Sequence, residues 1–127
     1  MQYKEISKLH YDLISLVEYK PDRLNEWQSP ADTEAKKTGD CEDFAIWWLN
    51  ALKDKGAYMQ AVVTSEGMHM ICVVEVERKK YGFCGGLQSV KYALDCNKSK
   101  PVRLSRYKLM GSPISFESAC YIYSSNL

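Results

Sequence analysis

The sequence lacks a long apolar run, and its charges do not favour one sign. No stretch approaches the roughly 20 apolar residues that a helix needs to cross a bilayer. The first residues, Met1 to Glu5, are charged from the fourth position and form no apolar secretory core. The chain has 17 basic and 16 acidic residues, which gives no electrostatic reason to expect a nucleic acid or a membrane as partner. We therefore expect a cytoplasmic protein; a virion or secreted setting stays open.

The sequence also lacks any Cys-x-x-Cys pair, although it has five cysteines. An odd number argues against a disulfide framework, which would be unusual in a cytoplasmic protein. His69 with Cys72, Cys84 and Cys96 matches no standard spacing of zinc ligands. We interpret four of the cysteines as small buried apolar side chains: Cys72, Cys84, Cys96 and Cys120.

Internal repeats, low-complexity tracts and linkers are absent, and the four prolines and seven glycines are scattered. A chain of 127 residues suits one hydrophobic core. Hydrophobic residues make up 46% and charged residues 26% of the chain, a balance typical of globular proteins. We predict a single domain over residues 1–127.

Helical spacing of apolar residues dominates the first half of the chain. It predicts an amphipathic helix over residues 4–19, ended by Pro21. Residues 21–39 are polar and irregular, with a short helical turn from Asp32 through Ala35. A second helix is predicted over residues 40–55 and is stopped by Gly56. Its apolar face is continuous, which indicates burial against a sheet, and comprises Cys41, Phe44, Ala45, Trp48, Leu49 and Leu52.

From Ala57 onward the apolar residues alternate with polar ones, which is typical of strands. The predicted breaks between the strands are Glu66-Gly67, Lys79-Lys80, Gly85-Gly86 and Gly111-Ser112-Pro113. Two helices followed by closely connected strands predict an α+β fold, with the second helix packed across an antiparallel sheet. The predicted strands cover residues 58–64, 69–77, 81–84, 90–96 and 114–123.

A candidate nucleophile lies in the block from Gly39 to Ala45, which reads Gly-Asp-Cys-Glu-Asp-Phe-Ala. Cys41 falls in the first turn of the second helix, where backbone N–H groups and the helix dipole favour a thiolate. The flanking carboxylates of Asp40 and Glu42 act in the opposite direction and raise the thiol pKa. The alternative is a core cysteine with Asp40 as an ordinary N-cap.

Two further residues complete a candidate triad. His69 is near the start of an otherwise apolar strand, a rigid position suited to a general base. Asp95 is a carboxylate among apolar strand residues, where an imidazolium would be a natural partner. It would orient the base. The order of a thiol, a histidine and an aspartate along the chain predicts a Cys-His-Asp hydrolase. The structural alternatives are a buried, satisfied histidine and a solvent-facing aspartate.

The same residues resemble the bacterial transglutaminase-like cysteine peptidases, a papain-like family that includes a calcium-dependent periplasmic protease that clips adhesins. The resemblance covers about residues 24–97, and the Gly-Asp-Cys-Glu-Asp block is its most specific part. Trp27, Pro30 and Glu34 precede that block, and His69-Met70 and Leu94-Asp95 follow it. The resemblance implies a papain-like or transglutaminase-core fold, with Cys41 as nucleophile, His69 as base and Asp95 as orienting acid.

The resemblance also implies a calcium site at Asp40 and Glu42. A bound cation there would remove the conflict between these carboxylates and a thiolate. No cofactor is required for the chemistry itself. For the oxyanion hole, the Cys41 N–H is one candidate donor, and Gln28 or the indole of Trp27 is the other. Trp27 could equally be a core residue above the helix.

The leading functional prediction is hydrolysis of an amide in a protein or peptide through a thioester acyl-enzyme. Two alternatives stay open: a transamidase, in which an amine replaces water, and a non-catalytic binding or structural module that keeps the fold. We expect no nucleic acid and no membrane as partner. The sequence does not determine the substrate or the oligomeric state.

Overall fold

The structure, a computed structural model, describes residues 1–20, 26–64, 67–83 and 101–124. The predicted strand over residues 90–96 lies outside these residues, as do Cys84, Asp95 and Cys96. Four α-helices are described, together with 3₁₀ turns at Lys53–Lys55 and Leu104–Arg106. These helices are α1 (Tyr3–Leu16), α2 (Pro30–Lys36), α3 (Cys41–Ala51) and α5 (Phe116–Ser124).

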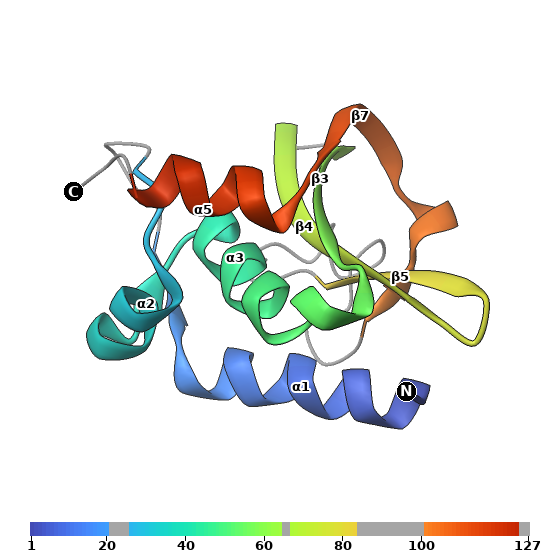
Figure 1. The fold of residues 1–127 in the computed structure, drawn as a ribbon, viewed down its shortest axis with the longest axis horizontal. Coiled ribbons are helices and arrows are strands. Elements are labelled where there is room, and N and C mark those ends of the chain that lie inside the picture. The colour runs from blue at the N-terminus through green and yellow to red at the C-terminus, as the bar shows by residue number, and fades with distance from the viewer. Residues whose placement is uncertain (21–25, 65–66, 84–100, 125–127) are drawn as a thin grey trace.

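The strands form one main sheet and one small one. Five antiparallel strands are arranged in the order β6-β5-β4-β3-β7, and β1 and β2 form a separate parallel pair. In Figure 1, α3 lies in the middle of the molecule, between α1 and α5 and beside the sheet. The strands are β1 (Glu18–Tyr19), β2 (Thr38–Gly39), β3 (Tyr58–Thr64), β4 (Gly67–Val76), β5 (Lys79–Phe83), β6 (Val102–Arg103) and β7 (Lys108–Ile114). The predicted α+β class, with helices packed on an antiparallel sheet, is confirmed.

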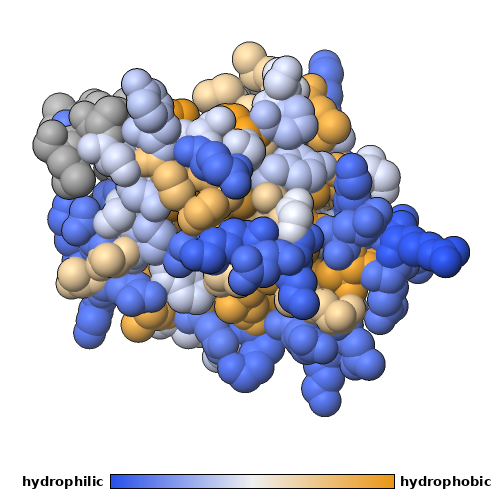
Figure 2. All heavy atoms as spheres, in the orientation of Figure 1, coloured by the Kyte–Doolittle hydropathy of each residue, from blue (hydrophilic) through white to orange (hydrophobic). Residues whose placement is uncertain are grey.

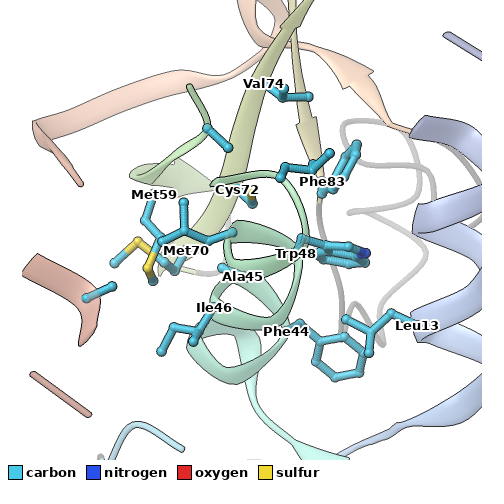
Figure 3. Packing of buried hydrophobic residues seen from close by; sticks show 14 of the residues in the cluster. Leu13, Phe44, Ala45, Ile46, Trp48, Met59, Met70, Cys72, Val74 and Phe83 are labelled. Atoms are coloured by element: carbon cyan, nitrogen blue, oxygen red, sulfur yellow. The ribbon is translucent and has the colours of Figure 1, made fainter. Parts of the chain in front are cut away.

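The main core forms around α3. Trp48 is fully buried and stacks on His10 of α1, with ring centroids 4.9 Å apart and an interplanar angle of 10°. Phe83 of β5 meets the same indole edge-on at 5.2 Å. In Figure 3, Phe44 lies beside Leu13, while Met59 and Met70 lie on the other side of α3. Burying each of these large side chains contributes about 1.5–3 kcal/mol, so α3 is fixed against both α1 and the sheet.

The first predicted helix is too long at its end. Helix α1 stops at Leu16, and Val17 adopts an extended conformation with φ −118°. The next two residues pair with β2 through Glu18–Thr38 and Tyr19–Gly39. This pairing brings the end of α1 next to the segment that leads into α3, and these backbone hydrogen bonds replace a further helical turn.

The irregular segment contains a longer helix than predicted. Helix α2 covers Pro30–Lys36, and Ser29 rather than Asp32 is its N-cap. The Ser29 hydroxyl accepts a hydrogen bond from the Asp32 N–H at 3.1 Å, and Pro30 occupies the first helical position, where it costs no hydrogen bond. The glutamate of α2, Glu34, accepts a hydrogen bond of 2.7 Å from the Trp47 indole.

The prediction of a strand over residues 114–123 is wrong. Residues 116–124 form α5, and the last strand of the sheet is β7, which also contains the predicted break at Gly111-Ser112-Pro113. The Ser115 hydroxyl accepts a hydrogen bond from the Ser118 N–H at 3.2 Å, as an N-cap does. Phe116, Ala119 and Tyr123 pack toward the core at helical spacing. Helical packing of these residues therefore overrides their β propensity.

Among the described residues, no helix combines the length and the apolar character needed to span a membrane.

Candidate active site

Helix α3 begins at Cys41 because Asp40 caps it. The Asp40 carboxylate accepts a hydrogen bond from the Asp43 N–H at 3.1 Å, and the Asp43 carboxylate accepts one from the Asp40 N–H at 3.0 Å. This reciprocal arrangement is a capping box, which satisfies two backbone donors that the first turn leaves open. It fixes Cys41 as the first residue of the helix, so Cys41 lies in the first turn as predicted.

Asp43 also holds the segment before the helix in place. Asp43 is 2% exposed, and its carboxylate accepts two hydrogen bonds of 2.8 Å from Gln28, one from the backbone N–H and one from the side-chain amide. The same amide nitrogen donates to the Thr38 carbonyl at 3.1 Å. With the Asp40 N–H, the carboxylate therefore has three donors. Asp43 had no assigned role in the sequence; the acidic pair three residues apart was the signal for it.

Gly39 provides the space for this carboxylate. A Cβ atom at position 39 would lie 2.8 Å from the Asp43 Cβ, closer than real Cβ atoms approach. The glycine in the Gly-Asp-Cys block therefore has a packing reason in this structure: it allows Asp43 to lie against the backbone before α3.

The Cys41 thiol lies against β4, beside the residue that follows His69. The backbone N–H of Met70 faces the Cys41 sulfur and lowers the pKa of the thiol. Pairing between β4 and β5 runs from Val76–Lys79 to Cys72–Phe83, so Met70 lies beyond it. On its other side the thiol is 3.5 Å from the Glu42 carboxylate and donates to it. Cys41 thus lies where the start of α3 meets the start of β4.

The electrostatics around the thiol favour its neutral form. Burial, followed by the nearby Glu42 carboxylate, raises the pKa of Cys41 to about 12, and the Met70 N–H only partly offsets this. The predicted opposition between flanking carboxylates and a thiolate is confirmed. The start of a helix is therefore not enough to ionise this thiol, and a base or a cation is needed in addition.

Asp40 and Glu42 form a carboxyl pair around Cys41. Burial, then Asp43 and Glu42, raises the pKa of Asp40 to about 8, and a hydrogen bond between the Asp40 and Glu42 side chains adds to this. Such a pair tends to keep one proton or to bind a cation, because ionising both of two close carboxylates is energetically unfavourable. The described residues contain no cluster of three or more histidine, cysteine or acidic side chains around a metal position.

Of the two residues predicted to complete the triad, His69 belongs to the described part of the chain and Asp95 does not. His69 is 7% exposed and pairs with Val62 across β3 and β4, so it is held on a rigid strand as predicted. Asp95 lies outside the described residues. The Cys41 thiol lies beside the Met70 backbone, whereas Val62, the pairing partner of His69, belongs to the cluster on the other face of the sheet. A contact between Cys41 and the His69 imidazole, and with it the complete Cys-His-Asp triad, stays a prediction.

The two candidate oxyanion donors have structural roles. Both amide hydrogens of Gln28 are used, by Asp43 and by the Thr38 carbonyl. Trp27 is partly buried and packs against the main core. Their predicted role in an oxyanion hole is not tested by these contacts.

The remaining described histidine and cysteines are distinct from this site. His10 is fully buried against Trp48 and Phe83, which agrees with a structural role. Cys72 is fully buried, as predicted. Cys120 is not: it is half-buried, and its sulfur lies 3.3 Å from the Tyr123 hydroxyl. The polar contact and the change from strand to helix explain this difference.

No protein-family model matches the chain, and no curated protein matches it. Solved structures of LapG from Legionella pneumophila are similar. The EGTA-treated form has a TM-score of 0.59 and 20% identity over 84% of this chain. The calcium-bound form has a TM-score of 0.57 and 21% identity over 84% of this chain. This chain thus has the transglutaminase-like fold of LapG, and it covers 60% and 62% of the length of those two chains.

Proposed function

We propose that this chain is a cysteine hydrolase that cleaves an amide bond in a protein or peptide, with Cys41 as nucleophile. The observation that carries this proposal is the position of the Cys41 thiol, at the first residue of α3 and against the Met70 N–H, one residue from His69. The fold supports it, because the resemblance of the Gly-Asp-Cys-Glu-Asp block implies the same transglutaminase-like architecture.

In the proposed reaction, His69 takes the thiol proton as Cys41 attacks the amide carbonyl. The tetrahedral intermediate expels the amine, which leaves with that proton, and a thioester remains. Water then gives a proton to His69 and adds its hydroxide to the thioester. The acid is released, and the proton returns to Cys41. Asp95 would orient the imidazole and stabilise its charged form.

The oxyanion would be held by the Cys41 backbone N–H, since N–H groups of a first helical turn have no acceptor within the helix. The second donor would come from the segment that carries Trp27 and Gln28. Gln28 would have to release Asp43 or Thr38 to take this role, because both of its amide hydrogens are in use.

A base is essential in this environment. A thiol whose pKa is about 12 is almost entirely neutral at pH 7. An imidazole that forms an ion pair with the sulfur would lower this value by several units, as in other paired cysteines. The pH dependence of thiol reactivity therefore separates the enzyme from a non-catalytic module with the same fold.

The test is site-resolved alkylation by iodoacetamide between pH 5 and 11, read by peptide mass spectrometry. Cys120, which is also half-buried, is the internal control. We expect Cys41 to react well below pH 8 in the wild type, and to lose this reactivity in His69→Ala and most of it in Asp95→Ala. A Cys41 that becomes reactive only above pH 9, with or without His69, would overturn the proposal.

Hydrolysis and amine transfer share this first half-reaction. Once an acyl-enzyme is trapped with a peptide ester, added glycine amide distinguishes them. We expect the free acid as the product; a predominance of the amide would assign the transamidase instead.

We further propose that Asp40 and Glu42 hold a calcium ion. The donor set fits, because hard carboxylate oxygens suit Ca²⁺, and the raised pKa of Asp40 indicates a carboxyl pair without enough positive charge around it. LapG has a calcium-bound form. Bound calcium would supply positive charge beside the Cys41 sulfur and favour its thiolate.

Calcium binding is tested by thermal unfolding in 1 mM CaCl₂ or in EGTA. We expect calcium to raise the Tm of the wild type and to have little effect on the Asp40→Asn/Glu42→Gln variant, with Asp54→Asn/Glu117→Gln as the matched control. Because protons compete for Asp40, whose pKa is about 8, the apparent affinity should increase from pH 6 to pH 8. An equal Tm shift in both double variants would contradict this site.

A further inference from the structure

A pocket of about 350 Å³ lies at the other end of β4, around the turn between β4 and β5. Its lining contains four cationic side chains and no carboxylate, together with apolar surface. The lining residues are Arg78, Lys79, Lys80, Arg103, Leu104, Ser105, Tyr107 and Leu109. The volume falls within the range of small-ligand and side-chain pockets.

The pocket marks a strong asymmetry of charge. Residues 78–82 and 101–109 contain six basic and no acidic residues, although Glu77 adjoins Arg78 and Glu75 pairs with Lys80 across β4 and β5. The rest of the chain has 11 basic and 16 acidic residues. The net charge of +1 therefore conceals a cationic region on an otherwise acidic protein. In Figure 2 the strongly hydrophilic atoms project on the side where Figure 1 places the turn that leads into β5. Such a region attracts anions locally, although the whole chain does not.

The cations of the pocket are not neutralised within the described chain. Among the described residues, one ion pair is shorter than 4 Å, Lys8–Asp12 on α1, and it does not involve the pocket. Aromatic rings position two of the pocket cations instead. The Lys80 ammonium lies 5.6 Å from the centroid of Tyr58, and the Arg103 guanidinium lies 5.9 Å from that of Tyr81. Cation–π contacts orient a charge without neutralising it, so these two remain available to an anion.

The sheet supplies an apolar floor beside these charges. Leu104 and Tyr107 pack on a small cluster that includes Val62 and Ile71. Gly82 permits this packing, since a Cβ atom there would lie 2.7 Å from Ile71 and 3.0 Å from the Tyr107 ring. Leu109, at the pocket margin, is 50% exposed. The pocket therefore offers apolar contact as well as positive charge.

The turn that presents Arg78 has an unfavourable backbone for its sequence. Glu77 and Arg78 have φ values of 53° and 67°, the left-handed values of a two-residue hairpin that favours asparagine and glycine. Arg78 therefore has a strained backbone and contributes a long cationic side chain to the pocket lining.

We propose that this pocket binds an acidic peptide segment and acts as a remote docking site for the protein substrate. The proposal rests on the proposed function for its substrate, but not for the binding itself. Arg78, in the turn after β4, is nine residues from His69, roughly 25–30 Å for an extended chain. An acidic segment held at Arg78 would thus lie about eight or nine extended residues from the bond that is cleaved, while Leu109, at the other margin of the pocket, pairs with Val62 next to His69. Such remote binding energy helps to position the reacting amide.

The distribution of charge favours a peptide over a nucleic acid. A nucleic acid carries a charge at every nucleotide, so any strand longer than the pocket would extend over the acidic remainder of the chain. In a peptide, the acidic residues can be confined to the few positions that contact the pocket. The apolar floor also fits the aliphatic or aromatic side chains that accompany them.

Binding is tested by fluorescence anisotropy with the full chain carrying Cys41→Ala, so that no cleavage occurs. The probe is a labelled eight-residue peptide with four Asp or Glu residues and one Leu; its control replaces the acids by Asn and Gln. We expect the acidic peptide to bind at least tenfold more tightly than the control, with an affinity that falls between 50 and 300 mM NaCl.

Matched variants locate the site. Lys79→Glu/Lys80→Glu should weaken binding at least tenfold, whereas Lys4→Glu/Lys36→Glu, which changes the net charge equally at exposed lysines elsewhere, should change it less than threefold. Arg78→Gly should also weaken binding, with a Tm equal to or above that of the parent because glycine relieves the turn. Equal losses in both double variants would overturn the proposal, as would a single-stranded oligonucleotide of equal charge that binds more tightly than the peptide.

These outcomes are separable from those of the proposed function. Failure of Cys41 to react below pH 8 removes the hydrolase but leaves peptide binding measurable. Loss of discrimination between the acidic and amide peptides removes the docking site but leaves the alkylation result unchanged.

Discussion

The two ends of β4 carry opposite chemistry on one rigid strand. At its start, acidic and mostly buried side chains surround Cys41, and most of their oxygens already accept hydrogen bonds from the fold. At its far end, exposed cations surround an open pocket, without a carboxylate in its lining. In the first arrangement, the carboxylates must be protonated or bind a cation to be stable, and the thiol needs a base to lose its proton. The second is ready to receive an anion without rearrangement. The start of β4 therefore suits chemistry, and the far end suits recognition.

The largest expected effect is on the thiol at the start of β4. If His69 forms an ion pair with Cys41, the wild-type thiol pKa lies below 8, and in His69→Ala it should return toward about 12. Since the thiolate fraction falls tenfold per unit, alkylation of Cys41 at pH 7 should slow by about 10³-fold or more. Lys79→Ala, at the other end of β4, should leave this rate unchanged. A small effect of His69→Ala would place the base elsewhere.

Removal of the Asp43 carboxylate should cause the largest loss of stability at this end. In Asp43→Ala, the donors from Gln28 and Asp40 lose their buried acceptor, which should lower the free energy of unfolding by about 3 kcal/mol. Urea denaturation measures this. Glu117→Ala, at an exposed position of α5, is the control and should change stability by less than about 0.5 kcal/mol. Similar losses in both would show that the hydrogen bonds of Asp43 contribute little.

Two glycines allow the two ends to be compared directly. Gly39→Ala should cost about 2–3 kcal/mol, since the new Cβ atom would meet the Cβ of Asp43, which a side-chain rotation does not move. Gly82→Ala should cost about 1 kcal/mol, because the first atom it meets is the terminal Cδ1 of Ile71. Thermal and urea unfolding of both variants test the order. The reverse order would mean that the pocket end is the more tightly packed.

The smallest effect concerns the carboxylate next to the thiol. Glu42 is the second cause of the raised Cys41 pKa, so Glu42→Gln in the His69→Ala background should lower the pH midpoint of alkylation by roughly one unit. Because the folded-state pKa of Cys41 lies above that of an unfolded thiol, the thiol contributes stability below pH 9, and this contribution is lost as pH rises to about 12. Glu42→Gln should narrow the pH range, from about 9 to about 12, over which this stability is lost. An unchanged midpoint would assign the high pKa to burial alone.

Several parts of the site were accessible from the sequence because they depend on local order. The position of Cys41 at the start of α3 follows from the cap at Asp40 and the apolar spacing of the helix. The predicted end of this helix is wrong: α3 stops at Ala51, and Gly56, with a φ of 74°, ends the separate 3₁₀ turn Lys53–Lys55. Strand β3 has the predicted bounds. The acidic pair Asp40 and Asp43 was a local signal for the capping box, but the contacts of Asp43 with Gln28 could not be predicted, since nothing local shows that Gln28 lies at the start of the helix.

Other parts were wrong or inaccessible for tertiary reasons. Residues 116–124 have strand-forming side chains, yet they form α5, because Ser115 caps a helix there and Ala119 packs toward the core. The end of α1 was misplaced because Glu18 and Tyr19 pair with β2, a contact between segments about 20 residues apart. Alternation and propensity contain no information about such partners.

The sequence by itself determined the α+β class, the cysteine at a helix start and the acidic residues around it, because periodicity and capping act between neighbours a few positions apart. Only the tertiary structure decided that this thiol lies against Met70 with a raised pKa, and that four basic residues from two separate segments line one pocket. Burial and the convergence of charge depend on which distant segments meet, and the folded chain fixes that choice.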